Sequence, residues 1–315
     1  MSAQTTPDAG ATTETRIERL TAASLRRIIE PEVEVAGSVG SGMLIPKELL
    51  SVADLDLDLT DEQWTALSRE ELASILDAGV RFESVLMAGF GLILAWQKDL
   101  VDPRVTYVLH EIGEETRHSR LFVRVIEQLS PKAVNPFTRG IYSRIDRFIT
   151  TRAITHKALF CLLVLTGEEV PDLIQKRSSE HPDTDPYVRE VNRYHRMEEA
   201  RHLAFARALL PEVWNEASVF ERFVIRRIGP AIMTGVFDSL IHPGVYRAVG
   251  LPGWRTWNNV RKTPARRDLR TESFRPVCDA LRTAGAFGRS GHLPRAWREF
   301  GQLDLPPSSL TSDPT

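Results

Sequence analysis

The chain has 315 residues, of which 42% are hydrophobic and 26% are charged. These values are close to the average for soluble globular proteins, so they exclude a disordered or fibrous chain. The 40 Lys and Arg residues nearly balance the 42 Asp and Glu residues, and a net charge of −2 argues against a protein dedicated to binding nucleic acid.

Signals for export and for a membrane are missing from the sequence. Two cysteines, Cys161 and Cys278, are too few for a disulfide framework, which favours a reducing, cytoplasmic location. The longest apolar run, 85–96, is shorter than the roughly 18–20 residues needed to cross a bilayer, and the first residues do not form a signal peptide. We therefore expect no membrane association, and disordered tails over residues 1–15 and 301–315.

A first long helix is predicted over about residues 69–100. Capping boxes are available at Thr60 and at Ser68, and the helix should end before Pro103, because the residue preceding a proline disfavours the helical conformation. A second helix is expected over 103–129, with a proline shortly after its end.

Two further long helices complete the pattern. One is predicted over 140–177, and the loop 181–186 separates it from the next, which should end at Leu210. Another helical stretch, 212–242, should kink at Pro230. Long helices joined by short Pro-containing loops predict an all-α protein built as a helical bundle.

Other secondary-structure signals are weak. Only the segment VEVAG near residue 33 alternates as a strand does, and residues 250–270 are expected to be an irregular segment with a solvated basic surface. A Gly-rich phosphate loop, a zinc-type Cys pair and a GxSxG nucleophile elbow are all missing.

The pattern EExRH occurs twice, in HEIGEETRHSRLF on the second predicted helix and in YHRMEEARHLAFA on the fourth. Residues three apart share one helix face, so Glu115 with His118, and Glu199 with His202, can each hold a metal ion. A single Glu-x-x-His is more often a solvated surface pair. Two copies 84 positions apart on separate helices indicate the carboxylate-bridged di-iron pattern, which also needs one Glu from each of the other two helices.

The other two helices offer such carboxylates. Glu83 lies within an apolar run, where an unpaired carboxylate is costly to bury; Arg81 is a possible structural partner, but metal ligation accounts for Glu83 better. Glu168 and Glu169 follow the apolar stretch ALFCLLVLTG, and periodicity does not separate them. Glu168 is the preferred ligand and Glu169 is the alternative.

A third histidine shares the face of the second pair. His195, Glu199 and His202 follow the spacing i, i+4, i+7, which favours ligation over the alternative of a hydrogen-bonded core histidine. The expected metal ligands are therefore Glu83, Glu115, His118, Glu168, His195, Glu199 and His202.

This donor set suits iron. Four carboxylates neutralise two ferrous ions, and carboxylates with imidazoles suit Fe or Mn rather than a thiolate-preferring metal. Glu114 and Glu198 each precede a proposed ligand. They can accept hydrogen bonds from the outer nitrogens of ligand histidines, with support from Arg117 and Arg201. The alternative is a set of simple surface pairs.

The paired EExRH segments, with Glu83, Glu168 and the third histidine His195, resemble the AurF-like di-iron N-oxygenases of the ferritin-like superfamily, typified by p-aminobenzoate N-oxygenase. The resemblance covers roughly residues 65–245. It implies a ferritin-like four-helix bundle with additional helices, which would form a single domain over residues 16–300.

The same resemblance implies a monooxygenase that uses two iron ions and O2 to convert an organic amine to a hydroxylamine, nitroso or nitro product in secondary metabolism. It also implies an external electron donor and a homodimer, with no further cofactor and no catalytic residue beyond the metal centre. Two alternatives stay open: a di-iron carbon hydroxylase or desaturase, acting for example on a carrier-bound acyl chain, and a non-catalytic iron-binding bundle. His195 counts against the first, and the extra helices count against the second.

Overall fold

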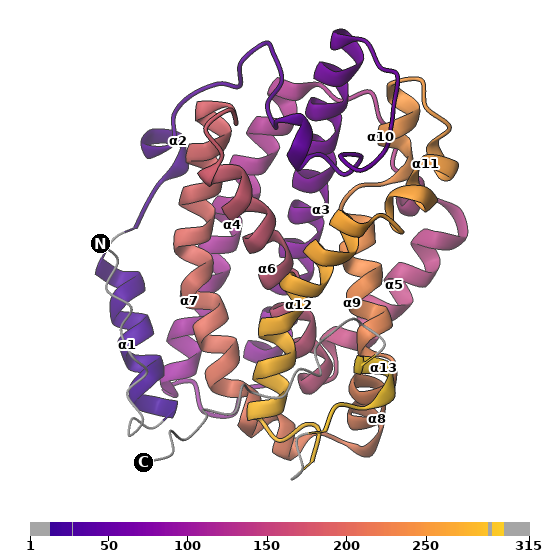
Figure 1. Ribbon diagram of the computed structural model, residues 1–315. Coiled ribbons are helices and arrows are strands. Elements are labelled where there is room, and N and C mark those ends of the chain that lie inside the picture. Colours follow the sequence, from indigo (N-terminus) through magenta and orange to yellow (C-terminus); the bar gives the residue numbers. More distant parts are fainter. Residues whose placement is uncertain (1–12, 27, 289–291, 299–315) are drawn as a thin grey trace, which may run out of the picture.

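The computed structural model describes residues 13–26, 28–288 and 292–298. Every regular element in these ranges is a helix, which confirms the all-α prediction (Figure 1). The segment near residue 33 that was predicted as a strand is instead the short helix α2 (Pro31–Glu34), because Pro31 at its first position is already held in a helical φ.

The predicted tails lie mostly outside these ranges. Residues 1–12 and 299–315 are not among the described residues. Helix α1 (Thr13–Arg26) begins inside the segment that was expected to be disordered, and it packs against α4 and α7. Its buried residue Ile17 belongs to the main hydrophobic core, which accounts for the order of this helix.

Four long helices form the bundle: α3 (Asp61–Trp96), α4 (Pro103–Leu129), α6 (Lys157–Glu180) and α7 (Pro186–Glu216). The most extensive helix–helix contacts pair α3 with α4 and α6 with α7. Short loops join the helices within each pair, whereas a long crossover carrying η2 (Pro136–Thr138) and α5 (Gly140–Ile154) links α4 to α6 (Figure 1). A four-helix bundle with one crossover is the ferritin-like arrangement, as the resemblance implies.

Helix α3 begins eight residues earlier than predicted. Its capping box is the one at Thr60, whose side chain accepts from Gln63 N, and it ends at Trp96. The hydroxyl of Ser68 is already engaged elsewhere, since it accepts hydrogen bonds from the backbone N–H groups of Leu44 and Ile45. Ser68 therefore ties a loop to the middle of α3 instead of starting the helix. Helix α4 has the predicted bounds, with Asp102 as its N-cap.

The third predicted helix is broken in two. Helices α5 and α6 meet at Thr155 and His156 with a bend of 115°. Thr155 Oγ1 donates to the carbonyl of Thr151, and the side chain of Glu221 accepts from Ala158 N at the start of α6. Side chains thus satisfy the backbone groups that a continuous helix would have paired.

Helix α7 runs past its predicted end. Pro211 lies inside the helix, and the last turn stays helical because Trp214 is buried in the core. The next predicted helix is two helices, α8 (Val219–Arg227) and α9 (Gly229–Ser239), which break at Ile228, just before the proline expected to cause a kink.

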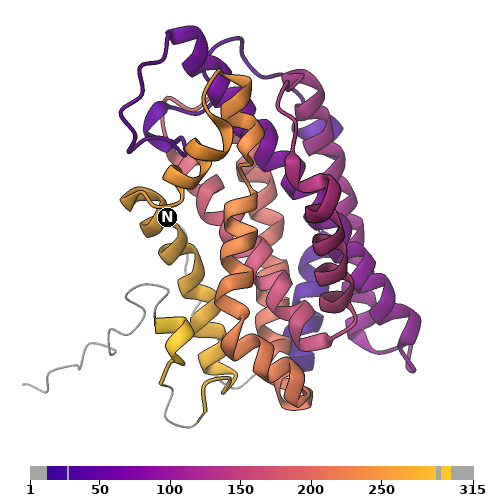
Figure 2. The ribbon, with the colours of Figure 1, turned by 90° about the vertical axis from the view of Figure 1, so that its right-hand side faces the viewer.

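Residues 250–270 are largely helical, contrary to the expectation of an irregular segment. They contain α11 (Gly253–Val260) and the start of α12 (Pro264–Thr283), which packs along α6. Each helix begins just after or at a proline. In the turned view of Figure 2 these C-terminal helices lie together along one side of the bundle. The remaining short elements are α10 (Pro243–Ala248), η1 (Lys47–Leu49) and α13 (Arg295–Arg298).

Two glycines let α3 and α6 approach each other closely. A Cβ at Gly167 of α6 would lie 1.7 Å from Phe82 of α3, and a Cβ at Gly89 of α3 would lie 2.3 Å from Phe160 of α6. Each ring therefore packs over a glycine of the opposite helix. Phe82 and Gly167 directly precede Glu83 and Glu168, so this packing sets the distance between the two helices at the level of those carboxylates.

Cys161 and Cys278 are both buried, and no disulfide joins them. By length and composition α3 is apolar enough to cross a membrane, although its longest uninterrupted apolar run did not suggest it. In the bundle, however, α3 packs along α4, and four polar residues in its first half are buried: Ser68, Glu70, Glu71 and Ser74.

Candidate metal centre

All seven predicted ligands project into the middle of the bundle. α3 supplies Glu83, α6 supplies Glu168, and the Glu-x-x-His pairs come from α4 and α7. None of the seven side chains is more than 5% exposed. Ionisable groups buried at this density are costly unless cations or hydrogen bonds compensate them.

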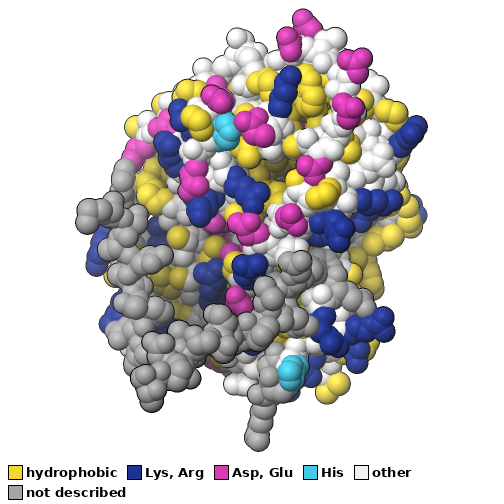
Figure 3. Space-filling view, viewed as in Figure 1, with side chains coloured by type: hydrophobic (Ala, Val, Ile, Leu, Met, Phe, Trp, Pro, Cys, Tyr) yellow, Lys and Arg dark blue, Asp and Glu magenta, His cyan; other side chains and the backbone are white. Residues whose placement is uncertain are grey.

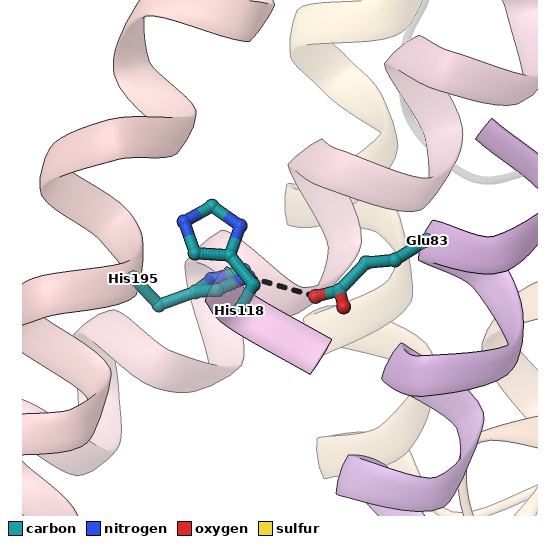
Figure 4. Close-up of side chains that lie close together, drawn as sticks. All are labelled: Glu83, His118 and His195. Atoms are coloured by element: carbon teal, nitrogen blue, oxygen red, sulfur yellow. Dashed lines mark ion pairs between the residues drawn. The ribbon is translucent and has the colours of Figure 1, made fainter. Parts of the chain in front are cut away.

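One cluster joins three helices and consists of Glu83, His118 and His195 (Figure 4). His195 Nε2 lies 3.5 Å from Glu83 Oε1. On the other side of the ring, His195 Nδ1 is 2.9 Å from Gln175 Oε1, which can only accept, so Nδ1 is the donor of this hydrogen bond. Nε2 is thus the ring nitrogen that faces Glu83 and is placed to bind a metal.

Glu115 and Glu199 lie between the two histidines of the EExRH segments. Glu115 places one oxygen 3.5 Å from His118 Nδ1 and the other 3.2 Å from His202 Nδ1. Glu199 does the same, at 3.0 Å from each ring. Two carboxylates that each direct one oxygen to either side have the geometry of bridges between two metal ions.

The structure separates Glu168 from Glu169. Glu169 forms an ion pair with Arg207, away from the other carboxylates. Burial and the neighbouring carboxylate of Glu199 raise the pKa of Glu168 well above its usual range. Glu168 thus faces Glu199 and His202, whereas Glu169 already has a cationic partner.

Glu114 and Glu198 hold the outer nitrogens of the two histidines across the helix pair. His118 Nε2 of α4 is 2.9 Å from Glu198 Oε2 of α7, and His202 Nε2 of α7 is 2.8 Å from Glu114 Oε2 of α4. These contacts confirm the predicted hydrogen bonds and fix Nδ1 as the nitrogen that faces Glu115 and Glu199.

Arg117 and Arg201 support this outer layer, also as predicted. Arg201 donates to Glu114 at 2.7 Å, and Arg117 lies 3.6 Å from Glu198. Tyr194 donates a further hydrogen bond to Glu198 at 2.9 Å. Burial raises the pKa of Glu114 and Glu198, but hydrogen bonds from the histidines and the positive charges outweigh it, so the pKa of each is lowered.

The electrostatics of the inner layer are those of a cation site. Burial lowers the pKa of His118 and His202, but the surrounding carboxylates outweigh it and raise the pKa of both rings well above the usual value. The pKa of Glu83 is raised by burial and by the charge of Glu115. The carboxylates of the interior thus favour positive charge at the positions of the two rings.

Buried polar atoms without a partner provide independent evidence that these residues fit a pair of metal ions. Several buried donor atoms have no hydrogen-bond partner in the described part of the chain: Glu83 Oε1, both oxygens of Glu115, His118 Nδ1, Glu199 Oε1 and both oxygens of Glu111. All of them lie in the three buried side-chain groups that can each hold an ion. Oxygen and imidazole donors without thiolates favour iron or manganese.

Glu111 was not predicted from the sequence. It is 1% exposed and shares a group with Glu115 and His202. A signal was present, because Glu111 lies four residues before Glu115 and thus on the same helix face.

The fold and these side chains define a ferritin-like bundle with a carboxylate- and imidazole-lined site for two metal ions. The chain belongs to the family described as P-aminobenzoate N-oxygenase AurF, whose family model matches residues 10–285. This is a ferritin-like family of non-haem di-iron oxygenases.

Mycobacterial proteins are also similar in sequence. The uncharacterized protein Mb0909 of Mycobacterium bovis and the uncharacterized protein Rv0885 of Mycobacterium tuberculosis are each 27% identical to this chain over 175 residues. The matched region is 54% of this chain and 50% of each relative. The chain thus spans about half the length of the curated relatives it matches.

Proposed function

We propose that this protein is a di-iron, O2-dependent N-oxygenase that oxidises an organic amine to a hydroxylamine, nitroso or nitro product in secondary metabolism. The observation that carries the proposal is the position of His195, whose Nε2 faces Glu83 and Glu199 at 3.5 and 3.4 Å. This third imidazole, in a chain of the AurF family, distinguishes the site from one with two histidines.

The proposed iron ligands are the seven predicted side chains, with Glu115 and Glu199 as bridges. Two bound irons would supply the electrons that activate O2. The protein's own part is to fix the donors: Gln175, Glu114 and Glu198 each hold the outer nitrogen of one histidine, so that the inner nitrogens of all three rings point to where iron would bind.

The surroundings of the site favour a neutral organic substrate. The ring of Phe122 lies 4.9 Å from that of His195. One helical turn from the carboxylates, Leu86 follows Glu83 and Val164 precedes Glu168, and both are buried. An apolar environment of this kind suits an uncharged amine better than an ammonium ion.

The insertion of one oxygen atom from O2 into an amine requires a source of electrons. Conversion of an amine and O2 to a hydroxylamine and water consumes two electrons and two protons. Both cysteines of the chain, Cys161 and Cys278, are buried and do not form a disulfide, so they offer no exposed thiol pair for relaying electrons. We therefore propose an external electron donor.

The test is product analysis with the full chain. Iron-loaded, reduced protein is mixed with O2 and a panel of aryl and alkyl amines that includes p-aminobenzoate, and hydroxylamine, nitroso and nitro products are followed by mass spectrometry with ¹⁸O2. Incorporation of ¹⁸O on nitrogen supports the proposal. Carbon-hydroxylated or desaturated products from acyl substrates, or iron uptake without any organic product, would instead support one of the two alternative functions.

A buried histidine outside the site serves as the matched control. His242 is 4% exposed and caps α10 by accepting from Gly244 N. Asparagine can provide the same acceptor, so His242→Asn should keep N-oxygenation. His195→Ala should abolish it.

We also propose a cytoplasmic homodimer that binds neither nucleic acid nor a membrane. In support, basic and acidic side chains are interspersed over the face shown in Figure 3, without a continuous basic surface. α5 contains no buried residue, and one of its faces exposes Ile141, Ile145, Phe148 and Ile149. A second copy would cover this apolar face, and Phe148→Asp should then reduce the mass measured by light scattering from that of a dimer to that of a monomer.

A further inference from the structure

The segments of α4 and α7 that carry the site place buried polar residues at the same spacing. On α7, His195, Glu199 and His202 are spaced i, i+4, i+7, and on α4, Glu111, Glu115 and His118 have the same spacing. Both triplets are buried on one face of their helix. Glu111 is thus the positional counterpart of His195.

Glu115 and Glu199, which lie between His118 and His202, divide the site into two halves. The half around His118 also contains Glu83 and His195, whose donor atoms form one group with it. The half around His202 contains Glu168, which faces Glu199. With the seven predicted ligands alone, this second half has one donor fewer than the first.

Glu111 completes the second half. Its carboxylate, Glu115 and His202 each place one donor atom within 4.8 Å of the other two. Ligand atoms around one ion lie at most about 4 Å apart when each is about 2 Å from the metal, so a small inward shift of these side chains suffices for shared coordination.

Protein contacts do not account for this carboxylate. Glu111 is 1% exposed, and neither of its oxygens has a hydrogen-bond partner in the described residues. Other buried glutamates have hydrogen-bond partners: Glu114 has His202 and Arg201, and Glu70 accepts from the backbone N–H groups of Lys132 and Ala133. An ionised carboxylate that is buried without such partners is costly unless a cation binds it.

We infer that Glu111 is an eighth ligand of the di-iron centre, a terminal carboxylate on the iron that His202 binds. The inference rests on the proposed iron centre. It makes the two positions chemically different: Glu83 and two imidazoles on one iron, and Glu111, Glu168 and one imidazole on the other, with two shared bridges.

The experiment compares Glu111→Gln with the wild-type full chain after anaerobic loading with ⁵⁷Fe(II). Iron per chain and the affinity for each iron are measured, and Mössbauer spectra report the two positions separately. Glu111→Gln should weaken one of the two irons by at least about 10–100-fold and alter only one of the two quadrupole doublets, because loss of an outer partner alone has an effect of that size. Glu83→Gln should alter the other doublet.

The matched control is Glu71→Gln, which replaces a buried glutamate on α3 that lies outside the site. It should leave both irons and both doublets unchanged. If Glu111→Gln is not folded by circular dichroism, Glu111→Asp keeps the charge and shortens the side chain by one methylene, and the same single-doublet change is expected.

Two results would contradict different claims. If the wild-type chain takes up two irons and the Glu111 variants show wild-type affinities with both doublets unchanged, Glu111 is not a ligand and the proposed function stands. If the wild-type chain does not take up two irons, the di-iron function fails, and the inference fails with it.

Discussion

His118 on α4 and Glu198 on α7 are joined by a hydrogen bond of 2.9 Å between the outer nitrogen of the ring and a carboxylate oxygen. The contact is repeated in the opposite direction by His202 and Glu114 at 2.8 Å. Each helix of the pair therefore orients the histidine of the other. Metal binding should depend on both helices, even on residues that do not reach the ions.

Glu198→Gln tests this dependence. The amide can still accept from His118, but the negative charge that supports the ring and pairs with Arg117 is lost. We expect iron affinity to fall about 10–100-fold, the range for loss of such an outer partner. Isothermal titration under nitrogen measures it. Glu212→Gln, on the same helix but paired with Arg104 near the surface, should leave the affinity unchanged, and equal affinities for both variants would contradict the role of Glu198.

The close approach of α3 and α6 makes a second prediction. Gly167→Ala places a methyl group 1.7 Å from Phe82, so the ring must move, and the adjacent Glu83 and Glu168 move with their helices. We expect a loss of stability of about 1–3 kcal/mol, as for other overpacked cores, and a lower iron content. Thermal unfolding and metal analysis measure the two effects.

Gly91 provides the control for that substitution. It lies on an exposed part of α3, and a Cβ there would meet no atom within 4 Å. Gly91→Ala should therefore stabilise the helix by roughly 0.5–1 kcal/mol through its better helix propensity. If Gly167→Ala also stabilised the protein, the packing between the two helices would not be as tight as described.

Glu71 predicts a pH dependence of stability that is independent of the metal centre. Burial raises its pKa from 4.5 to about 7, although hydrogen bonds from Ser51 oppose the shift. The folded state thus binds a proton that the unfolded state releases above pH 4.5. The stabilisation is fully present below pH 4.5 and is lost as the pH rises to about 7, on the order of 3 kcal/mol in all.

Glu71→Gln removes this proton. Near pH 4.5 the thermal unfolding midpoint of the wild type should be equal to or higher than that of the variant. Near pH 8 the midpoint of the wild type should have fallen relative to that of the variant. The comparison cancels the contributions of all other titrating groups. A constant difference between the two proteins over this pH range would show that Glu71 ionises alike in the folded and unfolded states.

His195→Ala separates a metal ligand from a core histidine. As a ligand, it should change the optical spectrum of the iron-loaded protein after exposure to O2, while the fold is retained. If His195 is instead a core histidine held by Gln175, its loss should lower stability by about 1–3 kcal/mol and leave the spectrum unchanged. His242→Asn should leave the spectrum as it is in the wild type.

Helix faces and some helix ends, which depend on neighbouring residues, could be predicted from the sequence. The bounds of α4 follow from Asp102 and Pro103 at its start, and the Glu-x-x-His spacing defines a helix face whatever the rest of the chain does. The outer layer of Glu114 and Glu198 followed from the same spacing.

Structural features that depend on contacts with residues far away in the chain could not be predicted from the local sequence. Glu168 and Glu169 are both buried, and only the position of Arg207 on α7 distinguishes them. The break between α5 and α6 depends on Glu221, which lies 63 residues from the Ala158 N–H that it accepts from. Glu111 is different, because its spacing from Glu115 was visible and its importance emerges only from its unpartnered burial.

The most direct test of the central claim is the iron content of the full chain after anaerobic loading and removal of excess metal. We expect two irons per chain, and a loss of at least about 10-fold in affinity when His118 or His202 is replaced by alanine. A single bound zinc, or no iron retained after loading, would contradict it.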